Sequence, residues 1–69
     1  MRVLIIEDSA EVVEAVSLCL QLRWPEADVV TATEGRKGLE ILRAQPVDIL
    51  ILDINLPDID GFEVLKKLR

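Results

Sequence analysis

The chain has 69 residues, of which 51% are hydrophobic, so it is expected to form one small packed domain rather than a disordered segment. Its formal net charge of -5 argues against direct binding to nucleic acid or to an anionic membrane surface. Cys19 has no second cysteine to pair with, and there is neither a signal peptide nor an apolar run of about 20 residues, so a reduced, cytoplasmic protein that does not span a membrane is expected.

The first element is a short strand over residues 3–6, which are all aliphatic. A run of this kind suits a strand that is buried on both faces, as in a parallel sheet. The strand must end at Glu7 and Asp8, because a charged pair cannot extend a buried strand. Ser9 is then a suitable N-cap for a helix over about residues 10–23, which ends before Pro25 because a residue that precedes proline avoids the α conformation.

This first helix is more apolar than a sheet-packed helix requires. Its apolar positions cover well over half of its circumference, whereas a stripe somewhat wider than ~100° is enough to pack on a sheet. The surplus falls on the side of Leu18 and Leu22. These leucines either lie exposed or against loops without a special role, or they form a surface for a partner, and the sequence leaves both interpretations open.

A second strand and helix follow. Residues 28–32 are β-branched and bounded by polar residues, which predicts a strand. Thr33 is the expected cap of a helix over about residues 34–45, which Pro46 ends and whose apolar face is formed by Leu39, Ile41 and Leu42. Gly38 weakens this helix by about 1 kcal/mol, and close packing on the sheet would explain its presence.

The third unit repeats the pattern. Residues 49–52 are aliphatic, predict a second buried strand and lead directly into Asp53. A proline-containing loop over residues 56–61 follows, and Asp60 is expected to cap a helix over residues 61–69 that buries Phe62, Leu65 and Leu68. The element order is thus β-α-β-α-β-α, and right-handed crossovers make this an α/β fold with a parallel sheet.

Three carboxylates are expected to meet at one edge of this sheet. Parallel strands place all their carboxyl ends on the same side, so Glu7, Asp8 and Asp53 should lie close together. Their mutual repulsion would be relieved by a hard cation such as Mg²⁺, whereas a zinc site is not expected, because the chain has no histidine and a single cysteine. Asp53 is also a candidate nucleophile that could form an aspartyl phosphate. The alternative is an ordinary solvated edge with acidic strand ends.

Two stretches, residues 4–8 (Leu-Ile-Ile-Glu-Asp) and residues 49–61 (Ile-Leu-Ile-Leu-Asp-Ile-Asn-Leu-Pro-Asp-Ile-Asp-Gly), closely resemble the receiver domain of two-component response regulators. Residues 32–35 and 38–42 also match, with Gly38 in place of a more common alanine. The resemblance implies a three-layer, flavodoxin-like fold and a bacterial, cytoplasmic phosphoprotein that is not itself an enzyme. It implies that Asp53 accepts a phosphoryl group from a sensor histidine kinase or phosphotransfer protein. It further implies that Glu7, Asp8, Asp53 and the backbone carbonyl of Asn55 hold Mg²⁺.

The resemblance covers essentially the whole chain but only the N-terminal half of such a domain. The family has five strands and five helices in roughly 120 residues, which is a common domain size. The switch hydroxyl after strand four and the lysine after strand five have no counterpart here. The strand over residues 49–52 would then have an unpaired edge, so we expect a homo-oligomer or binding of a complementary half rather than a stable monomer.

Rival functions are distinguished by what each requires. A haloacid-dehalogenase-type phosphatase needs a second aspartate where this chain has Asn55. A P-loop nucleotidase and a dinucleotide-binding domain each need a glycine-rich loop that is missing. The remaining alternative is a non-switching α/β interaction or scaffold fragment that self-associates.

Overall fold

The computed structural model describes residues 1–53, 63, 64 and 66. The elements follow in the order β1 (Arg2–Ile6), α1 (Ala10–Arg23), β2 (Asp28–Ala32), α2 (Gly35–Ala44) and β3 (Ile49–Leu52). The three predicted strands and the first predicted helix are therefore confirmed. Residues 63, 64 and 66 are helical, in agreement with the predicted third helix, while the predicted cap at Asp60 and the predicted core residues Phe62, Leu65 and Leu68 lie outside the described residues.

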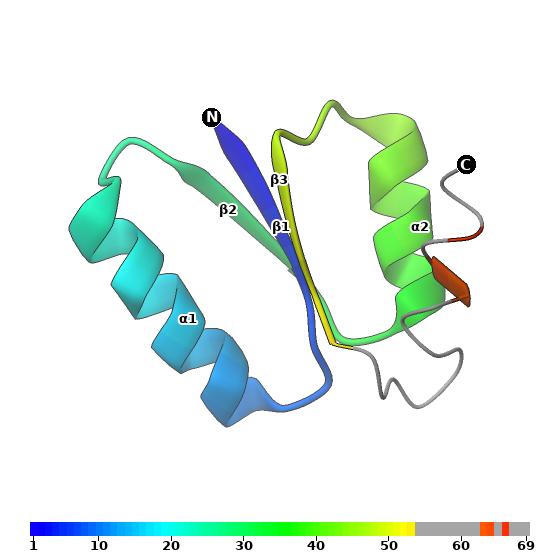
Figure 1. Cartoon of the computed structure of the whole chain (residues 1–69), viewed down its shortest axis with the longest axis horizontal. Coiled ribbons are helices and arrows are strands. Elements are labelled where there is room, and N and C mark those ends of the chain that lie inside the picture. Colours follow the sequence, from blue (N-terminus) through cyan, green and yellow to red (C-terminus); the bar gives the residue numbers. More distant parts are fainter. Residues whose placement is uncertain (54–62, 65, 67–69) are drawn as a thin grey trace.

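The three strands form one parallel sheet in the order β2-β1-β3. β1 is the central strand, and its last residue, Ile6, lies opposite Ala32 of β2 and Leu52 of β3. Figure 1 shows α1 on one side of the sheet and α2 on the other. The chain is therefore a three-layer α/β structure, as the sequence predicts.

β1 supplies the centre of the core on both faces of the sheet. Its four aliphatic residues, Val3 to Ile6, are each 0% exposed. Alternation along the strand directs Leu4 and Ile6 to the face covered by α2 and Val3 and Ile5 to the face covered by α1. Val64 is also fully buried, on the α2 side, although the sequence did not single it out.

Both ends of α1 are defined by hydrogen bonds. The Ser9 hydroxyl accepts from the backbone N–H of Val12 at 3.4 Å, which confirms Ser9 as the N-cap. At the other end the Trp24 N–H donates to the Leu20 carbonyl at 2.7 Å, and Pro25 follows. Neither helix in the described part of the chain combines the length and the apolar character that crossing a bilayer requires.

Two predictions about local structure are wrong, and the end of one helix is shifted by one residue. The N-cap of α2 is Glu34 rather than Thr33, because Glu34 is still extended (φ -134°, ψ 149°), and its side chain makes no capping bond. The helix also ends at Ala44, one residue earlier than expected. β3 is not buried on both faces: Ile49 is 37% exposed and the other three residues are half-buried, because β3 lies at the edge of the described sheet.

Gly38 lets α2 approach the central strand closely, as the sequence suggested. A Cβ atom placed on Gly38 would lie 2.6 Å from Cγ1 of Ile6, well inside van der Waals contact. Ile6 is fully buried beneath the helix. The absence of a side chain at Gly38 therefore sets the distance between α2 and the strand end that carries Glu7.

Arg2 joins the opposite end of the three strands. Its backbone N–H donates to the Asp48 carboxylate at 2.7 Å, and its Nε donates to Asp28 at 3.0 Å in an ion pair. Asp28 begins β2, and Asp48 immediately precedes β3. One residue of β1 thus holds both neighbouring strands at their amino ends.

Candidate functional site

The candidate site lies where β1 and β3 end at the carboxyl edge of the sheet. Backbone hydrogen bonds continue one residue past the paired ends Ile6 and Leu52: the Asp53 N–H donates to the Ile6 carbonyl at 2.9 Å, and the Glu7 N–H donates to the Ala32 carbonyl at 3.0 Å. The pairing of β1 with β3 therefore places Glu7 and Asp53 next to each other at the ends of adjacent strands. Asp8 follows as the first residue of the turn into α1.

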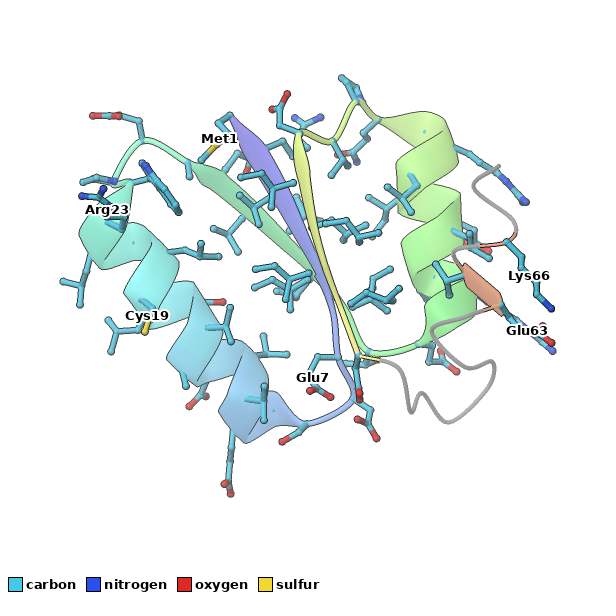
Figure 2. All side chains as sticks on the ribbon, viewed as in Figure 1. Met1, Glu7, Cys19, Arg23, Glu63 and Lys66 are labelled. Atoms are coloured by element: carbon cyan, nitrogen blue, oxygen red, sulfur yellow. The ribbon has the colours of Figure 1, made fainter. Side chains whose placement is uncertain are left out.

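The three carboxylates gather as the topology requires. One oxygen from each of Glu7, Asp8 and Asp53 lies within 4.8 Å of the others. Glu7 and Asp53 are half-buried, and Asp8 is exposed. Figure 2 shows Glu7 at the end of β1, with acidic side chains beside it. The structure thus brings these three predicted site residues together, while Asn55, the fourth predicted ligand, lies outside the described residues and the roles of all four stay predictions.

Opposing interactions act on the proton affinity of Glu7. The largest is the backbone N–H of Ser9, which donates to Glu7 Oε2 at 3.2 Å and lowers the pKa of the Glu7 carboxyl. Hydrogen bonding with Asp8, desolvation, and the hydrogen bond and negative charge of Asp53 act in the other direction. Together they prevail, so the pKa of Glu7 lies above its ordinary value. The raised pKa of Glu7 therefore reflects the two neighbouring carboxylates and the partial loss of solvent at this edge of the sheet.

The donor set suits a hard divalent cation. All three side chains offer carboxylate oxygens, which Mg²⁺ and Ca²⁺ prefer, and the chain contains no histidine. A compact group of three acidic oxygens leaves coordination positions for water or for the oxygens of a phosphoryl group. The site can therefore hold a metal ion beside Asp53, whose carboxylate can act as a nucleophile.

Ser9 has a role at this site that the sequence analysis did not assign to it. Its hydroxyl caps α1, while its own N–H fixes the Glu7 carboxylate. The sequence carries no local signal for this bond, because a side chain that accepts from the backbone N–H two residues on is typical of aspartate and asparagine rather than of glutamate. The turn into α1 thus both starts the helix and orients one of the three carboxylates.

A shallow depression of about 340 Å³ lies at the other edge of the sheet and is a poor candidate. It is lined by Met1, Arg2, Glu26, Asp28, Pro46 and Asp48. Asp28 and Asp48 both accept hydrogen bonds from Arg2, so these residues connect the strands rather than form a binding site. The carboxylate cluster at the carboxyl edge is therefore a better candidate for a functional site than this depression.

The sequence matches a family of known proteins. Residues 3–69 match the family model described as the response regulator receiver domain. The cell cycle response regulator CtrA of Brucella ovis is 39% identical over the whole chain. The match covers 29% of that protein, so the chain spans less than a third of the length of such curated relatives.

Solved structures agree with the sequence matches. The response regulator protein TrrA from Thermotoga maritima, in complex with Mg²⁺-BeF, superposes with a TM-score of 0.90 at 31% identity and covers 99% of this chain and 57% of its own. The chemotaxis response regulator CheY4 of Vibrio cholerae gives a TM-score of 0.89 at 35% identity, covering 99% and 55%. A structure of the histidine kinase ThkA in complex with TrrA also matches, at 31% identity, with a TM-score of 0.88 and coverage of 99% and 57%.

Proposed function

Because the chain belongs to the response regulator receiver domain family, we propose that it accepts a phosphoryl group from a histidine kinase on Asp53, in a Mg²⁺-dependent step of a two-component phosphorelay. Members of this family are phosphoacceptors and regulators rather than enzymes in the usual sense. The observation that carries the proposal is the meeting of Glu7, Asp8 and Asp53 within 4.8 Å at the carboxyl edge. A flavodoxin-like sheet collects its chemistry at that edge.

The metal ligands in this proposal are Glu7, Asp8, Asp53 and the backbone carbonyl of Asn55. Two features support Mg²⁺: the donors are all oxygen, and the raised pKa of Glu7 reflects crowded negative charge that a cation would relieve. The Mg²⁺-BeF complex of TrrA is a further precedent within the family. When bound, the ion offsets the negative charge of the transferring phosphoryl group.

In this proposal the protein provides the nucleophile, Asp53, and holds the reacting groups in position. Asp53 is held by its N–H bond to Ile6, at the point where β3 leaves the core. One of its carboxylate oxygens attacks phosphorus, the bond from phosphorus to the donor breaks, and the donor atom leaves with the electron pair and takes up a proton. The Ser9 N–H keeps the Glu7 carboxylate turned toward the cluster.

The partner in this proposal is a sensor histidine kinase or a phosphotransfer protein, in the cytoplasm. The complex of the histidine kinase ThkA with TrrA supports a partner of this kind, because the match to TrrA covers 99% of this chain and 57% of TrrA. The net charge of -5 and the acidic edge make direct binding of this chain to nucleic acid unfavourable.

Labelling with a small phosphodonor tests the proposal. Acetyl phosphate with Mg²⁺ should add one phosphoryl group to the chain, as measured by intact mass, and the modification should map to Asp53. Asp53→Asn should abolish labelling, whereas Asp28→Asn, at the opposite edge of the sheet, should retain it. Equal labelling of the Asp53→Asn chain, or labelling that does not depend on Mg²⁺, would refute the proposal.

A second candidate is a non-switching interaction or scaffold fragment that self-associates. The exposed Ile49 and the position of β3 at the edge of the described sheet favour it, because an apolar edge strand templates pairing with a second copy or a complementary half. This candidate predicts self-association but no phosphoryl group on Asp53 after treatment with a phosphodonor. Sedimentation, together with intact mass before and after the donor, distinguishes the two functions.

A further inference from the structure

Ser9 makes hydrogen bonds in two directions from the turn between β1 and α1. Its backbone N–H donates to Glu7 Oε2 at 3.2 Å, on the side of the carboxylate cluster. On the side of the helix, its hydroxyl accepts from the Val12 N–H at 3.4 Å and its carbonyl accepts from the Val13 N–H at 3.0 Å. This half-buried residue therefore belongs both to the cluster and to the first turn of α1.

Glu7 is the carboxylate of the cluster that gains most from such a bond. The backbone of Glu7 is fixed by its N–H bond to the Ala32 carbonyl, and that of Asp53 by its N–H bond to the Ile6 carbonyl. A glutamate side chain is one methylene longer than an aspartate side chain and has one more rotatable bond, so a fixed backbone does not fix its carboxylate. The Ser9 N–H supplies that constraint directly at the carboxylate oxygen.

The bond to Glu7 depends on the conformation that Ser9 adopts as the helix cap. Ser9 is extended, with φ -85° and ψ 116°, and in this conformation its N–H reaches Glu7 while its hydroxyl reaches Val12. The ends of a helix open locally much more readily than a whole domain unfolds. When the first turn opens, Ser9 is free to leave this conformation and its N–H is free to turn away from Glu7. The order of the turn and the position of the Glu7 carboxylate are therefore linked.

We propose that Ser9 is a positioning residue through which the first turn of α1 and the proposed Mg²⁺ site stabilise each other. The inference rests on the proposed function, because it requires the cluster of Glu7, Asp8 and Asp53 to bind Mg²⁺. A carboxylate that is already held in place loses less conformational freedom when an ion binds, so a closed turn favours the metal. Coupling of this kind is reciprocal, so the metal favours the closed turn by the same factor. The first turn of α1 thus responds to metal binding at the end of β1.

The charge of the site is compatible with this coupling. The N-terminal end of a helix favours negative charge, and Glu11 lies in the first turn of α1. A divalent cation carries fewer charges than the three carboxylates of the cluster, so the cluster with its ion remains negative. Metal binding therefore weakens the favourable interaction with the helix end without reversing it.

Mg²⁺ titration calorimetry of three variants tests how the turn affects the metal. Ser9→Ala removes the capping hydroxyl and should weaken Mg²⁺ binding roughly fivefold, at the low end of couplings between sites. Ser9→Thr keeps a capping hydroxyl and should restore the affinity. Val16→Ala is the control for lost stability, because it removes a contact of the same helix with the core around Val3 and Ile5, and it should leave the Mg²⁺ affinity unchanged. Circular dichroism verifies that each variant is folded.

Hydrogen exchange tests how the metal affects the turn. Saturating Mg²⁺ should slow exchange of the Val12 N–H in the parent chain by a similar factor, roughly fivefold. The Trp24 N–H, bonded to the Leu20 carbonyl at the other end of α1, should change less. Unchanged Mg²⁺ affinity of Ser9→Ala, equal weakening by Val16→Ala, or unchanged exchange at Val12 would overturn this inference and leave the proposed metal site intact. A parent chain that does not bind Mg²⁺ would overturn both.

Discussion

Replacing Gly38 with alanine adds one methyl group where α2 crosses β1. The new Cβ would lie 2.6 Å from Cγ1 of Ile6, whereas two carbon atoms prefer about 3.5–4.0 Å. A shift of roughly 1 Å is therefore required of either the helix or Ile6. Ile6 has little freedom, because it is fully buried and its strand is paired on both sides. The substitution therefore overpacks the centre of the core.

Two opposing contributions determine the change in the free energy of unfolding. Alanine favours the helix by about 1 kcal/mol over glycine. Overpacking of a well-filled core costs about 1–3 kcal/mol. We therefore expect Gly38→Ala to be neutral or to destabilise the chain by up to about 2 kcal/mol, and in a domain of this size about 1 kcal/mol moves the melting temperature by roughly 4–8 °C. Helix propensity alone would raise the melting temperature.

Urea and thermal denaturation followed by circular dichroism would measure this change, and Ile6→Val provides the control. Ile6→Val removes Cδ1, the Ile6 atom that the added Cβ would meet most closely, and alone should cost about 0.5–1.5 kcal/mol. In the double variant the two changes should partly compensate, so its loss should be smaller than the sum of the single losses. A Gly38→Ala chain that is about 1 kcal/mol more stable than the parent, or strictly additive losses, would show that the close approach of α2 to Ile6 is not limiting.

Three further predictions concern the acidic cluster. Saturating Mg²⁺ should raise the melting temperature at neutral pH and have less effect as the ligands become protonated at low pH; equal midpoints with and without metal would contradict a metal site. Without metal, Asp8→Ala and Asp53→Ala should each leave stability unchanged or raise it, because each removes repulsion; a clear loss for both in denaturant titration would identify the carboxylates as structural. The folded chain raises the pKa of Glu7, so between roughly pH 4.3 and that raised value the folded state binds more protons than the unfolded state. The contribution of Glu7 to metal-free stability should therefore be fully present below this window and be lost as the pH rises through it. Glu7→Gln should remove this contribution, whereas an identical pH slope in the variant would argue against the effect.

Local sequence signals were sufficient for most of the framework. Short aliphatic runs located β1 and β3, and Ser9 and Pro25 bounded α1, because caps and prolines act within a few residues. The start of α2 was misplaced by one residue because Thr33 and Glu34 compete for the cap and backbone conformation decides between them. The exposure of Ile49 depends on which strand lies next to β3, which residues 49–52 alone do not encode.

At the candidate site, too, some features could be predicted from the sequence and others could not. The gathering of Glu7, Asp8 and Asp53 follows from parallel topology, because all carboxyl ends share one edge of the sheet. The Ser9 N–H bond to Glu7 depends on a side-chain rotamer and a turn conformation, so it emerged only from the structure. The burial of Val64 likewise depends on which face of its helical segment meets α2 and β1.

The hydrogen bonds that Arg2 makes to Asp28 and Asp48 have a practical consequence for attaching this protein to other molecules. The Met1 carbonyl accepts from the Asp28 N–H at 2.9 Å, and Arg2 bonds to Asp48, so the first two residues are anchored at the amino edge of the sheet. In Figure 1 this terminus lies at the far end of β1 from the residue that leads into the turn to α1. A tag, fluorophore or surface linker joined before Met1 would therefore emerge on the side away from Glu7 and Asp53. A chain immobilised through that linker would present its acidic edge to the solution, open to metal, phosphodonor or kinase.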